Sequence, residues 1–520
     1  MLSISTYTWS ASYKIIRSPV FYYLCLHLAI GIVFAQTLHN NSTLVSICGL
    51  IGYLFLIKVD HKGNSKALCL SLIILHSIIL LSTSYWLLYC LIDFLKVNML
   101  AAYTVIIIGS VVLSLLFVLP GLLYHMQIKQ FSIGFSLSLL MITIEYLRSH
   151  LFLAMPWLFS GNITANFSLF AFLLPRLGFW VVTYMMLRSI ETIVNILHCR
   201  YDKDAYFLLP ILLIAAMYFA IYTVRGEQAQ PNSNAHAENK GLSINLLQLN
   251  HAHDTKTTLQ EKWSNHMLML YQTSKNALNI TAEGVATIDQ NDPIGLTKFK
   301  QFSVLKNTIL GINFKEKDKF TPMLIGTNHV YGDYKKQHLV PFGEYFPLPK
   351  FIKKWFGFLQ KKDLAIAKKP YDTKKSLISY NNYQLLPMIC YDVFFPLTLT
   401  QRGQKADAII VLAENTWYRN SVLQSMFWRV AKLRALESDK PVLLILNRGP
   451  SGHINPKGHV VQKSQYDEQT MLHTKLIKKN QSVSPWVPSG AIGIVLIWII
   501  EGSILSLLYL KRRAHYGSNA

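Results

Sequence analysis

Long, nearly uninterrupted runs of apolar residues constrain this 520-residue chain more than any other feature. Residues 18–224 form almost continuous hydrophobic blocks, and residues 486–510 form one more. Because 52% of the chain is hydrophobic and only 15% is charged, an ordinary soluble protein is excluded. Residues 242–484 have the mixed composition of a globular domain. The pattern therefore predicts a membrane domain, a domain outside the bilayer and a membrane anchor.

Eight segments approach the length of about 20 apolar residues with which a helix crosses a bilayer. Seven precede the globular region and one follows it, at residues 20–38, 43–58, 67–91, 97–124, 131–154, 169–190, 206–224 and 486–510. The polar stretch RGEQAQPNSNAHAENKG, with Pro and Gly in it, predicts a linker. We therefore expect a helical membrane domain over 1–224, a linker over 225–241, a globular domain over 242–484, and a last span with a basic cytoplasmic tail over 485–520.

The lysines and arginines of the short loops predict how these spans are oriented, because positively charged loops face the cytoplasm. One set of loops is rich in positive charge, and it contains Lys14, Arg17, Lys58, Lys62, Lys66, Lys129, Arg200, Lys203, Lys511, Arg512 and Arg513. The loops at 39–42 and 155–168 contain no lysine or arginine. With seven spans before it, the domain at 242–484 is expected outside the cytoplasm.

Short apolar runs bounded by turn residues recur in the globular region and predict β-strands. They lie at residues 244–250, 307–314, 322–328, 384–391, 407–415 and 441–447. Helical patterns at 257–277 and 423–440 lie between some of them. Strands that alternate with helices predict an α/β fold with helices on the sheet faces, and the functional residues of such folds gather at the strand ends.

Cys390 is the only cysteine of the globular region, so no disulfide can form within that region. It lies at the end of the strand predicted over 384–391 and directly precedes Tyr391 and Asp392. A cysteine becomes a useful nucleophile when a nearby base or positive charge produces the thiolate. A buried, inert thiol is the alternative.

Two further stretches favour a catalytic cysteine. YKKQHLVPFGEYFP, residues 334–347, places Pro, Gly and aromatic residues between lysines and a glutamate, as in a fixed loop that carries a cation. LNITAEGVA, residues 278–286, predicts a strand that brings Glu283 to its end. Together these stretches resemble the carbon–nitrogen hydrolase (nitrilase) superfamily, and most closely its membrane branch, the apolipoprotein N-acyltransferase family. HLVPFGEY is the most specific string, and EYLRSHLFLAMPWLFSGN, residues 145–162, resembles that family's arginine-containing helix and Pro-Trp turn.

The resemblance implies an αββα sandwich with a catalytic Glu-Lys-Cys triad and supporting residues around it. The matching positions are Glu283, Lys336 and Cys390 for the triad, and Glu344, Tyr391 and Asp392 for the support. The first triad member is the weakest match, because Thr281-Ala282 stands where the family has Trp-Pro, and Asp289 competes with Glu283 as the base. Asp392 also replaces the usual glutamate of the nucleophile motif.

Further residues are candidates for contact with substrate. They are Arg148, Trp355, Phe358, Asn415 and Trp417. Arg148 lies in an apolar span, where an arginine is costly unless it meets a lipid headgroup or a partner such as Glu145. The aromatic and basic residues of 349–362 suit a segment that contacts the membrane surface. Asn415 and Trp417 follow a predicted strand end, where a structural role is equally compatible with the sequence.

The activity implied by the resemblance is ping-pong acyl transfer. An acyl chain passes from a membrane phospholipid to the cysteine as a thioester, and then to the α-amino group of the N-terminal diacylglyceryl-cysteine of an apolipoprotein. The expected partners are the bilayer, the phospholipid donor and the diacylated acceptor. No cofactor, metal or nucleic acid is expected, and the protein is expected to be a monomer in the bacterial cytoplasmic (inner) membrane with its catalytic domain on the periplasmic side.

Two alternatives stay open at this point. In one, water rather than an amine attacks the thioester, and the protein is a membrane-tethered amidase. In the other, the departures at Thr281-Ala282 and Asp392 mark an inactive nitrilase-like membrane scaffold. The formal charge of +23 favours contact with anionic lipid surfaces, and no basic recognition helix or RNA-binding motif accompanies it.

Overall fold

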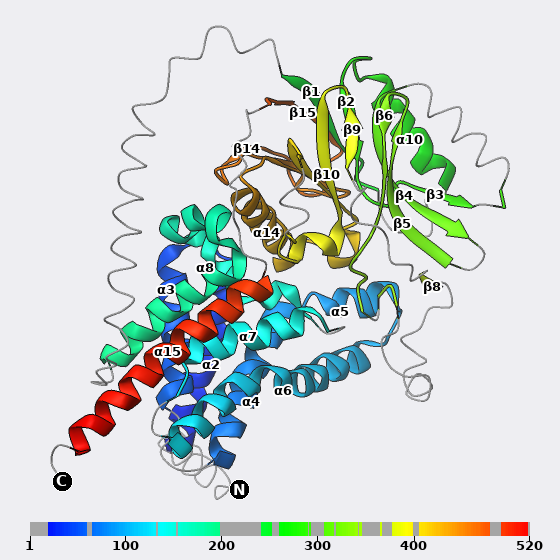
Figure 1. Ribbon diagram of the computed structural model, residues 1–520. Coiled ribbons are helices and arrows are strands. Elements are labelled where there is room, and N and C mark those ends of the chain that lie inside the picture. The colour runs from blue at the N-terminus through cyan, green and yellow to red at the C-terminus, as the bar shows by residue number, and fades with distance from the viewer. Residues whose placement is uncertain are drawn as a thin grey trace, which may run out of the picture.

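The computed structural model combines a bundle of apolar helices with two β-sheets (Figure 1). It describes residues 19–59, 65–131, 134–151, 154–197, 241–251, 259–289, 291–292, 306–316, 319–341, 343–345, 365–366, 377–398, 405–478 and 490–517. The predicted span at 206–224 and nearly all of the predicted linker at 225–241 lie outside these residues.

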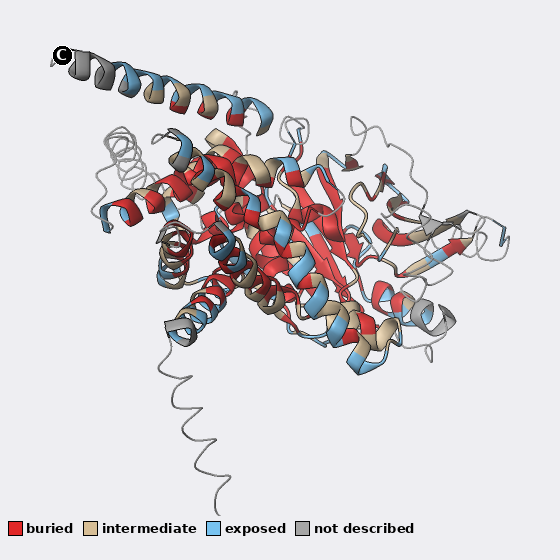
Figure 2. Cartoon of the chain, turned by 90° about the horizontal axis from the view of Figure 1, so that it is seen from below, coloured by how far each residue is buried: buried red, intermediate tan, exposed pale blue. Residues whose placement is uncertain are grey.

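The bundle contains most of the predicted spans as helices. They are α2 (Pro19–Thr37), α3 (Thr43–Val59), α4 (Ser65–Ser84), α6 (Met99–Phe131), α7 (Leu137–Ser149), α8 (Ser168–Leu197) and α15 (Gly490–Gly517). Within the described residues, four helical stretches are long and apolar enough to cross a membrane, at 66–84, 99–128, 168–197 and 490–507. Two shorter apolar helices lie at 22–37 and 43–58. Most of α15 is exposed, as expected for a helix that faces lipid (Figure 2).

Two predicted spans end early as helices in the structure. The helix predicted over 67–91 ends at Ser84, and a short helix α5 (Leu87–Tyr89) and a π-helix η1 (Cys90–Phe94) follow it. The helix predicted over 131–154 is only the 13-residue α7. Its start is fixed at Leu137 because the Ser136 side chain accepts from the Leu139 amide at 3.1 Å, and the Glu191 carboxylate accepts from the Leu137 amide at 3.1 Å.

The middle of the chain forms two sheets that face each other. The 8-stranded sheet has the order β15 (Thr470–Leu476), β1 (Leu242–Gln248), β2 (Leu278–Thr281), β4 (Thr308–Glu316), β5 (Lys319–Thr327), β7 (Asp333–Lys335), with β3 (Ala286–Asp289) paired to β4 and β8 (Ala365–Ile366) paired to β5. The 7-stranded sheet has the order β14 (Val460–Lys463), β13 (Gly452–Ile454), β12 (Val442–Leu446), β11 (Ala408–Ala413), β10 (Tyr383–Ile389), β9 (Ile378–Tyr380), β6 (Val330–Tyr331). The six predicted strands are confirmed as β1, β4, β5, β10, β11 and β12.

A helix covers each outer face of the sheet pair. α10 (Leu259–Tyr271) contacts β3 of the first sheet, and α14 (Val422–Ser438) contacts β12 and β13 of the second (Figure 1). Strands β1 and β5 of the first sheet contact β12 and β10 of the second. The predicted fold class, a helical membrane domain with an αββα sandwich, is therefore confirmed.

The two parts share one buried interior. α14 packs on α8 and on the 3-10 segment η3 (Ser160–Asn166) of the bundle, and a single hydrophobic cluster runs from Phe34 of α2 to Ile454 of β13 (Figure 2). Arg429 of α14 donates to the carbonyl oxygens of Thr37 and Asn40 at the end of α2. These contacts fix the sandwich on the bundle.

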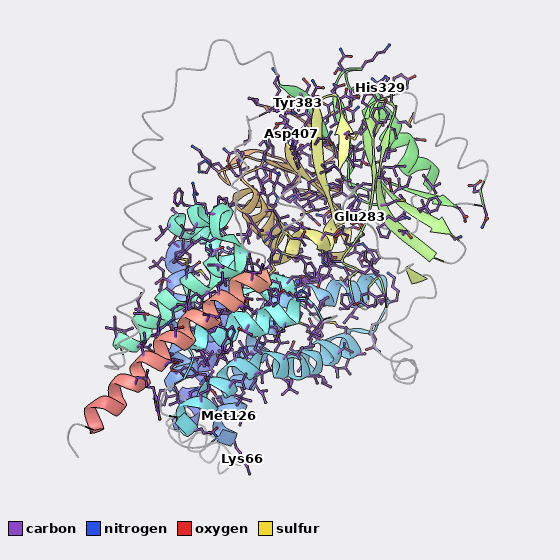
Figure 3. All side chains as sticks on the ribbon, viewed as in Figure 1. Lys66, Met126, Glu283, His329, Tyr383 and Asp407 are labelled. Carbon is purple, nitrogen blue, oxygen red and sulfur yellow. The ribbon has the colours of Figure 1, made fainter. Side chains whose placement is uncertain are left out.

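The central strands of both sheets are parallel, so their carboxyl ends meet at one edge of each sheet. β1, β2 and β4 run parallel in the first sheet, and β10, β11 and β12 run parallel in the second. In Figure 3, Glu283 lies at the sandwich edge nearest the helical bundle, whereas Tyr383 and Asp407, which begin β10 and precede β11, lie at the opposite edge. The strand ends that carry functional residues in α/β folds thus face the membrane helices.

Candidate active site

Cys390 lies in a strained turn between a strand and a short helix. β10 ends at Ile389, and the 3-10 helix η6 (Cys390–Phe394) begins directly after it. The φ angle of Cys390 is 49°, in the left-handed region that residues other than glycine rarely adopt. Such strained residues cluster at functional sites, where the surrounding structure holds them in place. Cys390 is also buried.

Asp392 holds this turn against the loop that follows β7. Its carboxylate accepts hydrogen bonds from the Ile389 amide at 3.2 Å, the Tyr334 hydroxyl at 2.9 Å and the His338 amide at 2.7 Å. Burial raises the pKa of Asp392, but the hydrogen bonds and charge of His338 outweigh that effect and bring the pKa below its usual value. The aspartate that replaces the expected glutamate therefore makes the contacts that connect the cysteine turn to the lysine loop.

Lys336 follows β7 and lies between two carboxylates. Its Nζ donates to Glu283 Oε1 at 3.3 Å and to Glu344 Oε1 at 2.6 Å, and its side chain is 1% exposed. Burial lowers the pKa of Lys336, but the neighbouring Cys390, Glu283 and Glu344 outweigh burial, so the pKa lies well above its usual value. Glu344 is itself fixed, because its Oε2 accepts from the Val340 amide at 2.8 Å. Lys336 is thus an ammonium held in place between two carboxylates.

Glu283 lies two residues beyond β2. Besides the contact with Lys336, its Oε2 accepts from the amide of Glu414, the residue that follows β11, at 3.1 Å. Burial raises the pKa of the Glu283 carboxyl to about 7, although Lys336 opposes the shift. A buried carboxylate with a pKa near neutrality is suited to accept and return protons.

Asp289, the competing base candidate, lies elsewhere. It ends β3 with a side chain that is 29% exposed, pairs with Lys315 at 3.0 Å and accepts from the Asn291 amide at 2.9 Å. The contacts therefore favour Glu283 as the carboxylate of the triad.

Cys390 is electrostatically coupled to both other members of the expected triad. The Cys390 thiol interacts most strongly with Lys336 and then with Glu283. Burial nevertheless raises the pKa of the thiol well above its usual value, and Glu283, Glu344 and Asp392 add to that rise. Burial therefore opposes formation of the thiolate, so a base is needed to take the thiol proton when Cys390 reacts.

The close approach of β4 to Glu283 requires a glycine at position 311. A Cβ at Gly311 would lie 2.3 Å from the carbonyl oxygen of Ala282 and 2.7 Å from Cα of Glu283. We expect Gly311→Ala to lower the free energy of unfolding by about 1–3 kcal/mol, because the two backbones must separate. Thermal unfolding of the purified protein measures this change. Gly109→Ala is the matched control, since no atom lies within 4 Å of a Cβ there; equal destabilisation by both variants would contradict the prediction.

Residues of the membrane bundle contact the neighbours of Cys390. The ring of Trp157 lies 6.1 Å from the ring of Tyr391, and the ring of Trp86 lies 4.9 Å from that of Tyr418, centroid to centroid. Tyr418, in the turn after β11, is partly buried, and its desolvation together with the nearby Cys390 raises its pKa. Sequence analysis did not identify Tyr418. The available signal was its position three residues after Asn415, just beyond the same predicted strand end.

The structure places the candidate substrate contacts in different surroundings. Asn415 is fully buried, and its amide is used within the chain, donating to Gln424 Oε1 at 2.9 Å and Gly449 O at 2.7 Å and accepting from the Arg448 amide at 2.9 Å. The Asn415 amide is thus occupied by contacts within the chain, which is the structural role that the sequence left open. Trp417 packs on Phe94 of η1, with ring centroids 4.3 Å apart, so it joins the two parts of the protein. Trp355 and Phe358 lie outside the described residues.

Arg148, the remaining candidate, is buried at the end of α7. Its guanidinium carbon lies 4.0 Å from the ring centroid of Phe117. The suggested ion pair with Glu145 is not among the ion pairs of the described residues, and the Glu145 carboxylate instead accepts from the Ser160 amide at 3.1 Å and the Ser160 hydroxyl at 2.7 Å. Within the same residues, no group of three or more His, Cys, Asp or Glu side chains is placed to hold a metal ion.

Comparison with known proteins identifies both parts of the chain. A family model for the apolipoprotein N-acyltransferase N-terminal domain matches residues 30–189, and a carbon–nitrogen hydrolase model matches residues 318–479. The second match contains Lys336 and Cys390 but begins after Glu283, so Glu283 is supported by its contacts alone.

Curated relatives match across both parts. The apolipoprotein N-acyltransferase of Pseudomonas aeruginosa PAO1 is 26% identical over 382 residues, which cover 70% of this chain and 72% of that protein. The apolipoprotein N-acyltransferase of Aquifex aeolicus is 27% identical over 404 residues, covering 74% and 85%. A solved structure of a carbon–nitrogen hydrolase superfamily protein from Xanthomonas campestris, XC1258, is 14% identical with a TM-score of 0.34, covering 46% of this chain and 91% of its own. The family models and the curated relatives place the chain in the apolipoprotein N-acyltransferase family, the membrane branch of the carbon–nitrogen hydrolases.

Proposed function

We propose that this chain transfers an acyl chain from a membrane phospholipid, through a thioester on Cys390, to the α-amino group of the N-terminal diacylglyceryl-cysteine of apolipoproteins. The contact of Glu283 with Lys336 at 3.3 Å, and the electrostatic interaction of both residues with Cys390 at the end of β10, carry this proposal. The names of the curated relatives support the same acceptor.

In the first step, Glu283 takes the proton of the Cys390 thiol while Sγ attacks the ester carbonyl carbon of the phospholipid. The carbonyl oxygen becomes an oxyanion, which the ammonium of Lys336 and a backbone N–H near Tyr391 stabilise. The intermediate collapses, and the bond between the carbonyl carbon and the glycerol oxygen breaks. Glu283 returns its proton to that oxygen, so a lysophospholipid leaves and the acyl chain remains on Cys390 as a thioester.

In the second step, the neutral α-amino group of the acceptor attacks the thioester carbonyl. Glu283 takes a proton from the attacking nitrogen, and Lys336 again stabilises the oxyanion. The carbon–sulfur bond then breaks, and the proton passes to Cys390 Sγ. The products are an N-acylated acceptor and the free enzyme, so no other reactant is consumed.

The membrane placement supports this chemistry. We place the catalytic domain, residues 242–484, outside the cytoplasm, with the membrane domain over 1–224, the linker over 225–241 and the C-terminal span within 485–520 of a bacterial inner membrane. Both substrates are anchored in the bilayer, so a site held against the membrane helices meets them at high effective concentration. No acyl chain then has to be carried through water.

A transfer assay tests the proposal. The purified protein, in vesicles that contain a radiolabelled phospholipid, is given a synthetic diacylglyceryl lipopeptide with a free α-amino group. We expect N-acylated lipopeptide and lysophospholipid in equal amounts. Free fatty acid released at the same rate with and without lipopeptide would favour the amidase, and the absence of every product would favour the inactive scaffold. Blocking the lipopeptide amine by acetylation is the control that should stop transfer.

The acidity of Glu283 sets the expected pH dependence of thioester formation. The reactive form is the ionised carboxylate, so the rate should be constant well above pH 7 and fall about tenfold per pH unit below it, since burial raises the pKa of Glu283 to about 7. Single-turnover measurements of thioester formation between pH 5 and pH 9 check this. A rate that falls only below about pH 4.5, the range of an ordinary glutamate, would contradict it.

A further inference from the structure

Arg148 is a buried cation, and two of its hydrogen-bond donors have no acceptor among the described residues. The residue is 4% exposed, and its Nε and Nη2 atoms are buried without a hydrogen-bond partner among the described residues. A buried charge without a hydrogen-bonded partner destabilises a protein. A group that supplies hydrogen-bond acceptors to Nε and Nη2 of Arg148 would remove this cost.

The polar side chains around Arg148 are already engaged with other residues. The Glu145 carboxylate accepts from the amide and hydroxyl of Ser160, and the hydroxyl of Tyr53 bonds to Nε2 of His76 at 2.9 Å. Both Glu145 and Tyr53 influence Arg148 electrostatically. These side chains therefore lie around the guanidinium of Arg148 but leave its Nε and Nη2 donors without hydrogen bonds.

A third unfilled donor atom lies on the turn that follows α7. Trp157, in the 3-10 helix η2 (Pro156–Leu158), has a buried Nε1 atom without a partner in the described residues. Its ring packs against Tyr391, and Tyr391 in turn influences Arg148 electrostatically. All three unfilled atoms are donors, so the missing group is one that accepts hydrogen bonds.

The residues around the guanidinium indicate which kind of acceptor group can bind there. The rings of Phe117 and Phe159 lie 4.0 Å and 5.5 Å from the guanidinium carbon and occupy positions where a cation contacts an aromatic face. The unfilled donors lie at the edge of the guanidinium plane, where arginine binds phosphate with two parallel hydrogen bonds. An anion with several acceptor oxygens fits this site, and a neutral donor group does not.

We propose that Arg148 and Trp157 bind the phosphodiester of the phospholipid acyl donor. The assignment rests on the proposed function and adds the binding site that selects the donor. The phosphodiester is attached to the glycerol that carries the scissile ester, and Tyr391 connects the site directly to Cys390. Binding of the phosphate thus positions the ester carbonyl beside the thiol and distinguishes a phospholipid from a neutral diacylglycerol.

Lipid binding to a protein that cannot react tests the site. In the Cys390→Ala background, short-chain phosphatidylglycerol and a diacylglycerol with the same chains are titrated in detergent, with tryptophan fluorescence as the readout. We expect Arg148→Gln to weaken phosphatidylglycerol binding by roughly 30- to 100-fold and Trp157→Phe by about 10-fold. Diacylglycerol binding should change less than about threefold, since a neutral headgroup forms no charge-assisted hydrogen bond with the site.

Single-turnover thioester formation in the protein with Cys390 intact provides the second readout. Arg148→Gln should remove the preference for phosphatidylglycerol over diacylglycerol, and Arg148→Lys should restore part of it. Arg176→Gln is the matched control, because the Arg176 guanidinium contacts the ring of Phe172 and donates to its carbonyl oxygen at 2.6 Å. Its preference should equal that of the unmodified protein.

Three results would overturn the assignment: equal losses with both lipids, which indicate a structural arginine; no loss with either; or the same loss in the Arg176 control. If the unmodified protein forms no thioester with any lipid, the proposed function fails, and the binding titration still decides whether Arg148 recognises phosphate. Thermal unfolding of each variant separates misfolding from loss of binding, and Trp157→Phe retains the packing ring if Arg148→Gln does not fold.

Discussion

Cys390→Ala should abolish the acyl-enzyme and reduce transfer to the acceptor by roughly 10⁴-fold or more, as expected when a covalent nucleophile is removed. The reason is geometric as well as chemical. Cys390 occupies the left-handed turn at the end of β10 and is coupled to Lys336 and Glu283. Intact-protein mass spectrometry after incubation with phospholipid measures the result: one added acyl chain on the unmodified protein and none on the variant.

The other cysteines provide a control for this measurement. Cys25 and Cys48 are exposed on α2 and α3, within the bundle and away from the strand ends. Cys25→Ala should retain the full acyl adduct and full transfer. An adduct that persists in Cys390→Ala, or transfer that survives there at more than a few per cent, would mean that another nucleophile carries the acyl chain.

The central strands could be predicted because they are buried on both faces. Every residue of β11 and of β12 is buried, and such strands appear in a sequence as short continuous apolar runs. β14 has a mostly exposed pattern, and β6 has only two residues, so neither produces a distinct hydrophobic signal. The missed strands have two to four residues each, except β15, which has seven but lies at a sheet edge and is only partly buried.

The residues of the candidate site could be predicted where a strand end or a known motif marks them in the sequence. Cys390 and Glu283 lie at or just beyond the ends of apolar runs, and Lys336 lies in a motif that resembles a known family. Tyr418 was missed because its closeness to Cys390 depends on how β11 and the bundle meet. The contact of Asn415 with Gly449 likewise depends on the adjacent strand, β12, and no local pattern encodes it.

The bounds of α7 likewise depend on residues that are distant in the chain. Hydrophobicity alone extended this helix over 131–154, whereas the structure begins it at Leu137 and ends it at Ser149. Its start is determined by Glu191 of α8, which lies 54 positions away in the chain. The 3-10 helix η2 (Pro156–Leu158) follows α7 in the chain and brings Trp157 against Tyr391.

Glu283→Gln should slow thioester formation by about 10²- to 10⁴-fold, the range associated with the loss of a positioned general base. Glutamine has nearly the shape of glutamate, and its carbonyl oxygen can still accept from Lys336 or from the Glu414 amide. What it cannot do is take the proton of a Cys390 thiol whose pKa burial holds well above the usual value.

The pH profile separates loss of this base from disruption of the site. If Glu283 is the base, Glu283→Gln loses the fall in rate below about pH 7 along with most of the rate, because the group that titrates there is gone. Asp289→Asn is the matched control, since Asp289 contacts Lys315 and Asn291 outside the site, and its rate and profile should be unchanged. A profile that keeps its fall near pH 7 in Glu283→Gln and loses it in Asp289→Asn would move the base to Asp289. A profile unchanged in both would mean that neither carboxylate takes the thiol proton, and the triad would then reduce to the lysine and the cysteine.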